Sequence, residues 1–448
     1  MVEKISIETP VQFSDPLPEA VDVAIIGGGV IGIFASLYLA RAGKKVCVLE
    51  KGRISAEQSS RNWGWIRQHE RDEAEVPIAM EALRLWKEAD SEVGGATGFV
   101  NTPINYLASS EKERAGLEGW MAIAEKYGVN SVRLSKKQIA DLFGGLSNSQ
   151  WVGGTSTLDD ARAEPWEAIP AIARLAHQQG VTIIENCAAR SLEIAAGQVA
   201  GLHTEQGLVK CQQVVLAAGA WSLLFARKHG ISFPQLSVNL TAMQTAPMQN
   251  FTEHNSADED FAIRRRNDGG YTLAVCDGND FFIGPDAFRN FFKYVPLLKE
   301  SWDHTYLNPM APKNFPDAWT TKRSWADDET TPFERCRVLE PAPNMKYVRK
   351  AISAFEKRFP TLGKPQILDS WAGMVDAMPD VVPLIDTISA LPGLVVATGF
   401  SGHGFGFGPG AAMIVRDLIL GNKPTHDISR FRYTRFSDGS PMLLGPAL

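Results

Sequence analysis

Three glycines near the start of the chain, Gly27, Gly29 and Gly32, have the G-x-G-x-x-G spacing of a loop that holds phosphate groups. The first permits a tight turn, the second lets backbone amides approach a pyrophosphate, and the third lets a helix pack closely on a strand. Glu50 follows about 20 positions later, where a carboxylate accepts hydrogen bonds from an adenosine ribose. The spacing predicts a dinucleotide site, and a glycine turn in an ordinary α/β protein is the alternative. The rest of the predicted loop is Gly28, Val30 and Ile31.

The segments around these residues occur in the order that such a site requires. Residues 21–26 are an apolar β-branched run typical of a buried parallel strand, residues 31–42 are an apolar helix, and residues 45–49 are a second strand. The amides and the dipole at the start of that helix favour a bound phosphate. Together these segments are a more specific signal than the glycine spacing alone.

Length and composition set broad limits. A chain of 448 residues, with 44% hydrophobic and 21% charged residues, is expected to form a soluble enzyme of two closely packed domains. A net charge of -6 gives no basic surface for nucleic acid. The five cysteines are scattered without a C-x-x-C pair, so neither a disulfide framework nor a metal site is expected. Residues 1–20 lack the apolar segment of a signal peptide or membrane span, which favours a cytoplasmic protein.

Residues 51–70 are predicted to be a binding loop after the second strand. Its polar side chains suit phosphate and ribityl oxygens, and Trp63 and Trp65 flank Gly64, where they are predicted to cover a flat ring. Tryptophans that fill a gap in the core are the alternative. The polar candidates are Lys51, Ser59, Ser60, Arg61 and Asn62.

Two later segments resemble further nucleotide-binding turns. Residues 214–216 are a strand that ends in small residues before Trp221, which lets backbone approach a ligand. Residues 394–397 are a strand, residues 399–410 are predicted to be an open glycine loop, and residues 411–420 a helix. Two separated loops would hold one long cofactor from both ends, which favours a flavin dinucleotide over a nicotinamide one.

The expected fold is α/β (α+β overall). It combines a Rossmann-like FAD-binding domain with an interleaved substrate domain built on a mostly antiparallel sheet. The FAD domain is predicted to comprise residues 21–90, 158–230 and 365–448, after an N-terminal extension of residues 1–20. The substrate domain is predicted at residues 91–157 and 231–364. Within it, residues 290–333 are irregular and are interpreted as a lid, a partner-binding insertion or a loop.

Over nearly its whole length the chain resembles the D-amino acid oxidase and glycine oxidase superfamily, and within it the bacterial L-amino acid deaminases. The matching segments are EKGRISAEQSSRNWG, NCAARSLE, AAGAWS, KYVPLL, TPFERCR and DSWAGMVDAMPDVVPLI. The resemblance implies FAD, with the glycine loop on its phosphates, Glu50 on the ribose and residues 59–62 beside the isoalloxazine. It further implies contacts from Ala188, Ala189, Ala218, Gly219, Gly399, Ser401, Gly402, His403 and Gly404.

The chain departs from these relatives at several positions. The arginine that holds a substrate carboxylate aligns with Val375 or Cys276, so Arg67 or one of Arg264, Arg265 and Arg266 is expected to take its place, or the substrate lacks a carboxylate. The cysteine that links flavin covalently aligns with Gly373, so FAD is expected to be non-covalent. The lysine that assists oxygen aligns with Phe282, which leaves a dehydrogenase open. The deaminases also carry an N-terminal membrane segment, which this chain is expected to lack, and residues 290–333 resemble their extra region.

The predicted reaction removes hydride from a carbon that bears nitrogen and gives an imine that water hydrolyses. The substrate is an amine or amino acid, and the electron acceptor is oxygen or another molecule. The expected pocket residues are His403, Trp65 and Asp376 for catalysis and Arg67, Cys276 and Phe400 for binding, with Asp376 favouring a cationic amine. The alternatives are a 2-hydroxy acid dehydrogenase and a non-catalytic flavoprotein. A flavoenzyme that modifies nucleic acid is disfavoured by the acidic charge balance.

Overall fold

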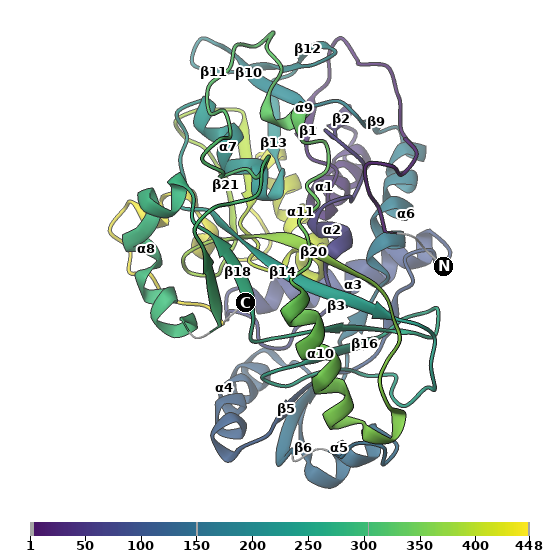
Figure 1. Cartoon of the computed structure of the whole chain (residues 1–448). Helices are drawn as coiled ribbons and strands as arrows, with labels where there is room; N and C mark the ends of the chain where they lie inside the picture. The colour runs from purple at the N-terminus through teal and green to yellow at the C-terminus, as the bar shows by residue number, and fades with distance from the viewer. Residues whose placement is uncertain (1–3, 149–150, 303, 447–448) are drawn as a thin grey trace.

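A six-stranded sheet carries the first glycine loop. The computed structural model of the chain describes residues 4–148, 151–302 and 304–446 (Figure 1). The strand order is β21-β22-β13-β1-β2-β9, and neighbours are parallel except for the antiparallel pair of β21 and β22. The strands are β1 (Val23–Ile26), β2 (Val46–Leu49), β9 (Thr182–Ile184), β13 (Gln213–Leu216), β21 (Leu384–Thr387) and β22 (Leu394–Thr398). The sheet therefore joins the beginning, middle and end of the chain.

Both faces of this sheet are buried, which explains why its strands are apolar without alternation. Along β1, Val23 and Ile25 pack into the core on the helical face, and Ala24 and Ile26 pack into the core on the other face. The helices on the first face are α1 (Val30–Arg41), α3 (Val76–Glu92), α6 (Pro165–Gln178) and α11 (Gly404–Leu420). The second face carries β10 (Ala189–Ala195), β11 (Gln198–Thr204), β12 (Gly207–Lys210) and α7 (Ser222–Lys228).

A second, ten-stranded sheet is centred on the long antiparallel pair of β14 (Leu236–Thr245) and β20 (Ile367–Ala377). Only the pairs β15/β5 and β18/β19 are parallel among the pairings recorded for the described residues of this sheet. The prediction of a Rossmann-like sheet beside a mostly antiparallel one is thus confirmed. The other strands are β5 (Ile104–Ala108), β6 (Ser131–Ser135), β7 (Gly153–Thr157), β15 (Asn255–Ala257), β16 (Ala262–Arg265), β17 (Tyr271–Ala274), β18 (Asn279–Phe282) and β19 (Thr305–Asn308).

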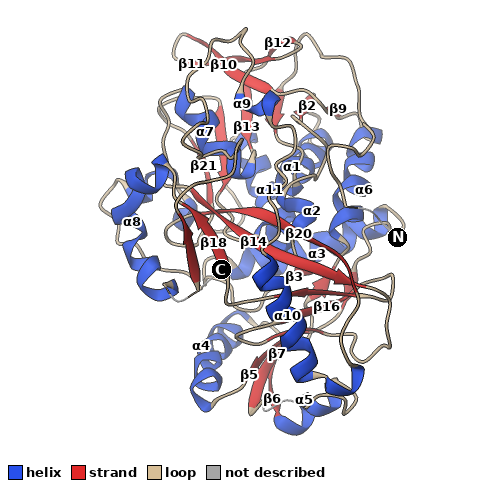
Figure 2. Cartoon of the chain, in the orientation of Figure 1, coloured by secondary structure: helices blue, strands red, loops and turns tan. Residues whose placement is uncertain are grey.

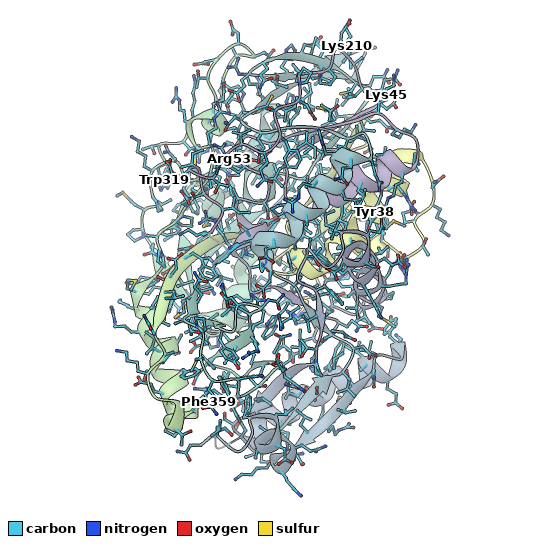
Figure 3. The ribbon with its side chains drawn as sticks, turned by 90° about the vertical axis from the view of Figure 1, so that its right-hand side faces the viewer. Tyr38, Lys45, Arg53, Lys210, Trp319 and Phe359 are labelled. Atoms are coloured by element: carbon cyan, nitrogen blue, oxygen red, sulfur yellow. The ribbon has the colours of Figure 1, made fainter. Side chains whose placement is uncertain are left out.

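Smaller elements complete the chain (Figure 2). A three-stranded sheet is formed by β3 (Trp65–Ile66), β8 (Ala161–Arg162) and β4 (Val100–Asn101). The helix α10 (Met345–Arg358) packs its Phe355 into the core of the larger sheet. Lys210 of β12 and Phe359 after α10 lie toward opposite ends of the molecule (Figure 3). The remaining helices are α2 (Gln58–Arg61), α4 (Glu111–Tyr127), α5 (Lys136–Leu142), α8 (Pro285–Ser301) and α9 (Pro332–Arg335), with 3-10 turns at Gly219–Trp221, Pro360–Leu362, Ser429–Phe431 and Tyr433–Phe436.

The predicted division into domains stays a prediction. The structure adds that β20 lies inside residues 365–448, which were assigned to the FAD domain, yet pairs along β14 in the larger sheet. Within the described ranges, no helix is both long and apolar enough to cross a membrane.

The expectation of an open glycine loop over residues 399–410 is wrong for most of its length. The helix α11 begins at Gly404 and runs through the glycines, so only residues 399–403 form the loop. These glycines allow close helix packing: a Cβ at Gly406 would lie 2.9 Å from the Ile66 Cα, and one at Gly410 would lie 2.7 Å from the Ile78 carbonyl oxygen. Residues 290–333 were predicted to be irregular, but residues 290–301 belong to the helix α8 (Pro285–Ser301).

The close packing of α11 on α3 predicts that alanine has opposite effects on stability at Gly410, which lies in this contact, and at Gly116, which lies in α4. We expect Gly410→Ala to lower the free energy of unfolding by about 1–3 kcal/mol, because its Cβ would collide with backbone that cannot yield. The matched control is Gly116→Ala in α4, whose Cβ would meet no atom within 4 Å. Alanine there should stabilise the protein by about 0.5–1 kcal/mol, as glycine costs that much in a helix. Urea denaturation measures both, and equal effects would refute the packing account.

Candidate functional site

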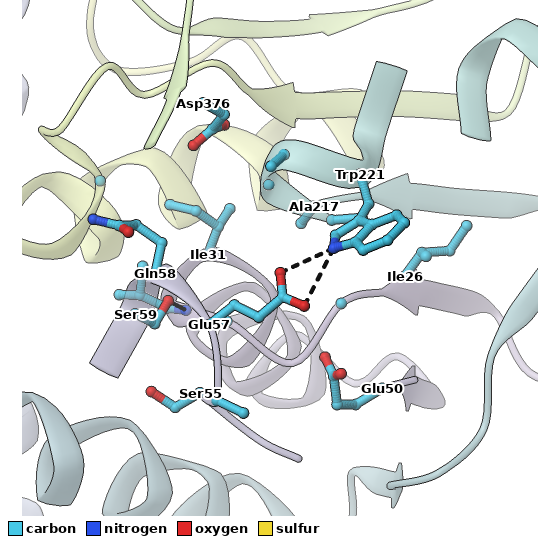
Figure 4. A pocket seen from close by; sticks show the side chains of 18 of the residues that line it. Ile26, Ile31, Glu50, Ser55, Glu57, Gln58, Ser59, Ala217, Trp221 and Asp376 are labelled. Carbon is cyan, nitrogen blue, oxygen red and sulfur yellow. Dashed lines mark hydrogen bonds between the residues drawn. The ribbon is translucent and has the colours of Figure 1, made fainter. Parts of the chain in front are cut away.

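A cavity extends between the end of β1 and the first turn of α11 (Figure 4). Most of its wall comes from four parts of the chain, residues 26–31, 49–62, 217–225 and 374–405, and Ala189 and Phe333 complete it. The four parts include the carboxyl ends of β1, β2, β13 and β22, at the edge of an open α/β sheet where such folds bind ligands. The two predicted glycine loops therefore face one cavity.

The first glycine loop is fixed by close backbone contacts. Gly27 has a φ of +109°, and a Cβ on it would lie 2.5 Å from the Ala217 carbonyl oxygen. A Cβ on Gly32 would lie 2.0 Å from the Gly27 carbonyl oxygen. Only glycine fits at either position, so α1 starts directly at the cavity with Gly29, Val30 and Ile31 in its wall. The Val30 amide donates to the Ser59 hydroxyl at 2.9 Å, which joins this start to the loop after β2.

Glu50 lies at the cavity wall just after β2. Its two carboxylate oxygens accept hydrogen bonds from the amides of Gly28 (2.8 Å) and Gly52 (2.7 Å). Burial raises the pKa of this carboxyl to about 7, and the neighbouring Lys51 opposes that rise. The carboxylate is thus held rigidly beside the glycine loop.

Glu57 joins three parts of the cavity wall. Its carboxylate accepts hydrogen bonds from Trp221 Nε1 (3.0 Å), Lys51 Nζ (2.6 Å) and the Leu339 amide (3.0 Å). The bonds to Trp221 are drawn in Figure 4. Lys51 Nζ also lies 4.5 Å above the Trp221 ring and donates to the carbonyl oxygen of Cys336 at 2.8 Å. The segment after α9 is thereby fastened over this end of the cavity.

Asp376, at the end of β20, holds the second loop. Its Oδ2 accepts hydrogen bonds from the Gly399 amide (2.6 Å) and the Thr398 hydroxyl (3.1 Å), and its carbonyl oxygen accepts one from the Ser401 amide (2.8 Å). Burial raises the pKa of the Asp376 carboxyl, and the Gly399 amide opposes that rise. Asp376 lies in the cavity wall with Phe400. Its carboxylate is already engaged by the loop, which weakens the interpretation of Asp376 as a receptor for a free amine.

Two polar atoms in the wall lack a partner. Ser55 Oγ and Gln58 Oε1 are buried and make no hydrogen bond with the described protein atoms. A buried polar atom without a partner is costly, so both are suited to hydrogen bonds with a bound molecule.

The structure brings together about half of the predicted site residues in this cavity. Those in the wall are Gly27, Gly29, Val30, Ile31, Glu50, Lys51, Ser59, Asn62, Ala189, Ala218, Gly219, Trp221, Asp376, Phe400, Gly402 and Gly404. Those outside the wall are Gly28, Gly32, Ser60, Arg61, Trp63, Gly64, Trp65, Arg67, Ala188, Cys276, Gly399, Ser401 and His403. Wall residues that were not predicted include Arg53, Ser55, Glu57, Gln58, Phe333 and Met374.

Ser60 and Arg61 point away from the cavity because they lie on α2, a single helical turn. Successive side chains of such a turn point in different directions, so Ser59 faces the cavity and Ser60 and Arg61 do not. Arg61 instead donates to the carbonyl oxygens of Ala56 (2.9 Å) and Ala372 (3.2 Å), and so ties the loop to β20. Glu57 and Gln58 could have been found from the sequence, because both lie in the segment AEQSSRNWG of the predicted binding loop.

The two tryptophans pack against the larger sheet. Their rings meet edge to face, with centroids 5.5 Å apart. They line a separate small cavity together with Ala262, Arg264 and Thr272. This position agrees with the alternative that Trp63 and Trp65 fill the core.

The arginines proposed for a substrate carboxylate already have partners. Arg264 forms two hydrogen bonds with the carboxylate of Glu164 (3.1 and 2.9 Å), and Arg67 donates to the carbonyl oxygens of His69 (2.7 Å) and Glu70 (3.2 Å).

Arg71, which the sequence did not single out, differs from these arginines. Its guanidinium is fully buried, and its Nε donates to the Arg67 carbonyl oxygen (3.2 Å), but its Nη1 has no partner and no ion pair with a carboxylate is recorded for it among the described residues.

His403 lies between two wall residues but faces away from the cavity. Its Nδ1 is 3.0 Å from Glu75 Oε2, and its buried Nε2 has no partner among the described atoms. Burial, reinforced by the nearby Arg71 charge, lowers the pKa of His403 to about 4. The imidazole is therefore neutral at pH 7, with Nδ1–H assigned as the donor to Glu75.

The lowered pKa of His403 predicts a pH-dependent stability. In the unfolded chain the imidazole takes up a proton near pH 6.5, whereas in the folded protein it does so only near pH 4. Its contribution is present above pH 6.5 and is lost as the pH falls toward 4, by about 3 kcal/mol in total. We expect His403→Gln to lose less stability over this range than the wild type, as measured by urea denaturation. The exposed His177→Gln is the control, and parallel curves for all three proteins would contradict this assignment.

Comparison with solved structures supports the fold. L-Amino acid deaminase from Proteus myxofaciens, solved in complex with anthranilate, is 27% identical over 96% of both chains, with a TM-score of 0.90. L-Amino acid deaminase from Proteus vulgaris is 26% identical over 95% of this chain and 100% of that one, with a TM-score of 0.88.

Comparison with curated proteins gives longer relatives. Human mitochondrial sarcosine dehydrogenase is 23% identical over 94% of this chain and 42% of its own length. The mouse mitochondrial pyruvate dehydrogenase phosphatase regulatory subunit is 27% identical over 67% of this chain and 35% of its own length. The chain thus spans less than half the length of these two relatives. The family model described as "FAD dependent oxidoreductase" (DAO) matches residues 22–418, so the chain belongs to the DAO family of FAD-dependent oxidoreductases.

Proposed function

We propose that the chain is an FAD-dependent oxidoreductase that oxidises a carbon–nitrogen bond of an amino acid or amine. The observation that carries the proposal is that two glycine loops from opposite ends of the chain face one cavity. The deaminases that resemble the chain over nearly its full length support it.

The residues of the cavity fit FAD. The start of α1 would offer amides and a positive dipole to the pyrophosphate, and Glu50 would accept a hydrogen bond from the adenosine ribose. Ser55 Oγ and Gln58 Oε1 lack partners that hydroxyl and amide groups of the cofactor would supply. At the other end, the loop that Asp376 holds would bind the flavin. Bound FAD supplies the acceptor for two electrons and one proton.

In the proposed reaction a hydride leaves the carbon that bears nitrogen, and the nitrogen lone pair forms a C=N bond. Water then hydrolyses the imine to a carbonyl compound and ammonia or an amine. The protein contributes orientation and exclusion of water, through apolar wall residues such as Met374, Phe400 and Phe405. His403 is neutral and turned away, so we assign it a structural role in the loop rather than that of a base.

Arg71 is our candidate for holding a substrate carboxylate. A fully buried cation without an ion-pair partner is costly, and a bound anion would relieve that cost. Arg71 lies within electrostatic range of Glu75 and of His403, and His403 belongs to the loop whose Gly402 lines the cavity. This candidate favours an amino acid over an amine without a carboxylate.

The Arg71 candidate can be tested with anthranilate, which bears a carboxylate beside an amine. We expect Arg71→Met to raise the Kd for anthranilate by about 30-fold or more, read from the absorption of bound flavin, because the buried charge pair is lost. The exposed Arg84→Met should leave the Kd unchanged. If Arg71→Met retains FAD and the wild-type Kd, Arg71 does not hold the carboxylate.

A second candidate is a non-catalytic role, which the regulatory subunit among the relatives favours. Anaerobic reduction of the flavin distinguishes the two. The holoprotein is mixed without oxygen with L- and D-amino acids, N-methyl amino acids, amines that lack a carboxylate, and 2-hydroxy acids. We expect an amino acid or amine to bleach the oxidised-flavin absorption, and the rate of recovery in air reports whether oxygen is the acceptor. Bleaching by 2-hydroxy acids alone, or by no compound although dithionite bleaches the flavin, would contradict the proposal.

A further inference from the structure

A short segment around α9 closes one side of the cavity. We call residues 331–340 the strap; they comprise α9 and the residues on either side of it. Thr331 and Glu334 form a capping box that orders the start of α9. Phe333 of α9 lines the cavity, and its ring centroid lies 5.8 Å from that of Trp221, another wall residue. The strap is therefore part of the cavity wall as well as its cover.

The strap packs directly on the loop after β2. A Cβ on Gly52 would lie 2.1 Å from the Arg337 carbonyl oxygen and 2.9 Å from the Val338 side chain. Lys51 Nζ donates to the Arg337 carbonyl oxygen (3.0 Å), and the Arg337 guanidinium donates to the Lys51 carbonyl oxygen (3.1 Å). Gly52 lies between the wall residues Lys51 and Arg53 but is not itself in the wall that the described residues form. The glycine at this position thus admits the strap without contacting the cavity.

Charged side chains fasten the strap to its neighbours, and it is not part of a sheet. Residues 331–340 are all described, and none of them belongs to a strand, so the strap can move away without breaking a sheet. Local opening of such a segment requires less free energy than unfolding of the whole protein. The pairs that hold it are Arg337 with Glu205 (2.6 Å), Glu334 with Arg190 of β10 (2.5 Å) and Glu340 with Arg61 of α2 (3.1 Å).

We propose that the strap is a gate for FAD, which opens before the cofactor enters or leaves the folded protein. The proposal rests on the FAD site proposed above and adds how the cofactor is retained. Glu57 of the cavity wall accepts hydrogen bonds from the Leu339 amide (3.0 Å) and from Lys51 Nζ (2.6 Å), so one side chain joins the strap to the wall. Glu50, the residue proposed for the adenosine ribose, directly precedes Lys51. The closed strap therefore covers the adenosine end of the site, and a dinucleotide bound there cannot pass a backbone that lies in contact with the loop that holds it.

The rate of FAD release tests the proposal. The holoprotein is diluted, and the fluorescence of free flavin is followed with time. We expect Gly52→Ala, whose Cβ would displace the Arg337 carbonyl, and Arg337→Ala, which removes the pair with Glu205, each to release FAD about tenfold faster than the wild type. The matched control is Arg133→Ala, which removes an exposed pair with Glu118 (2.6 Å) and should release FAD at the wild-type rate.

The thiol of Cys336 reports the opening of the strap independently of the flavin. Cys336 lies in the strap, is 7% exposed and is a free cysteine. Its alkylation by N-ethylmaleimide, measured by mass spectrometry of the peptide, should also become about tenfold faster in both strap variants, because the reagent reaches the thiol only when the strap is open. The buried Cys211, which lies outside the strap, should react at the wild-type rate in every protein.

The flavin content of the wild type separates this proposal from the proposed function. A wild type that neither carries nor takes up FAD would overturn the FAD site and the strap with it. If the wild type holds FAD and both strap variants release it at the wild-type rate, the strap alone is overturned. The same conclusion follows if Cys336 reacts faster in the variants while FAD release does not change, because an open strap would then not limit the exit of the cofactor.

Discussion

The close approach of α1 to the sheet is the constraint on which the site depends. Gly27 passes within contact distance of the Ala217 carbonyl oxygen, and Gly32 lies against the Gly27 carbonyl oxygen. Any side chain at these positions would push α1 away from β1 and β13. Because α1 can start at the sheet edge, its first residues lie in the cavity wall. The site thus follows from backbone packing, and the side chains refine it.

The far end of the cavity depends on a different contact. The carboxylate of Asp376 binds the Gly399 amide and the Thr398 hydroxyl, so β20 of the larger sheet positions a loop of the smaller sheet. Arg61 makes a similar link between α2 and Ala372. The two sheets are joined at the places where a cofactor would lie. Binding of the cofactor is therefore coupled to the relative position of the two sheets. Asp376 is therefore better explained as a residue that positions the loop than as one that selects the substrate.

The sequence predicted helices and strands correctly where a pattern of residue types is compatible with only one kind of structure. Residues 21–49 alternate strand, glycines, helix and strand, and the structure places β1, α1 and β2 within two residues of the predicted bounds. Glycine has two uses, however, and the run from Gly404 to Gly410 allows helices to pack closely rather than opening a loop. The sequence pattern also could not predict where the side chains of α2 point. In the structure Ser59 points toward the cavity and Arg61 points away from it. Glu57 lies in the predicted binding loop, but its contacts with Trp221 and Leu339 join distant segments and could not be predicted. Arg71 gave no signal in the sequence. Phe288, Phe291 and Phe292 of α8 are exposed, which contradicts the usual rule that apolar residues face the core, so the sequence alone did not predict that helix.

The central claim is that the two loops hold one non-covalent FAD. The most direct measurement is the flavin content of the native protein, followed by acid precipitation and analysis of the supernatant. We expect about one FAD per chain, released intact into the supernatant, because Gly373 stands where related enzymes attach flavin through cysteine. A protein that purifies without flavin and does not take up added FAD, or one whose flavin stays with the precipitate, would contradict the account.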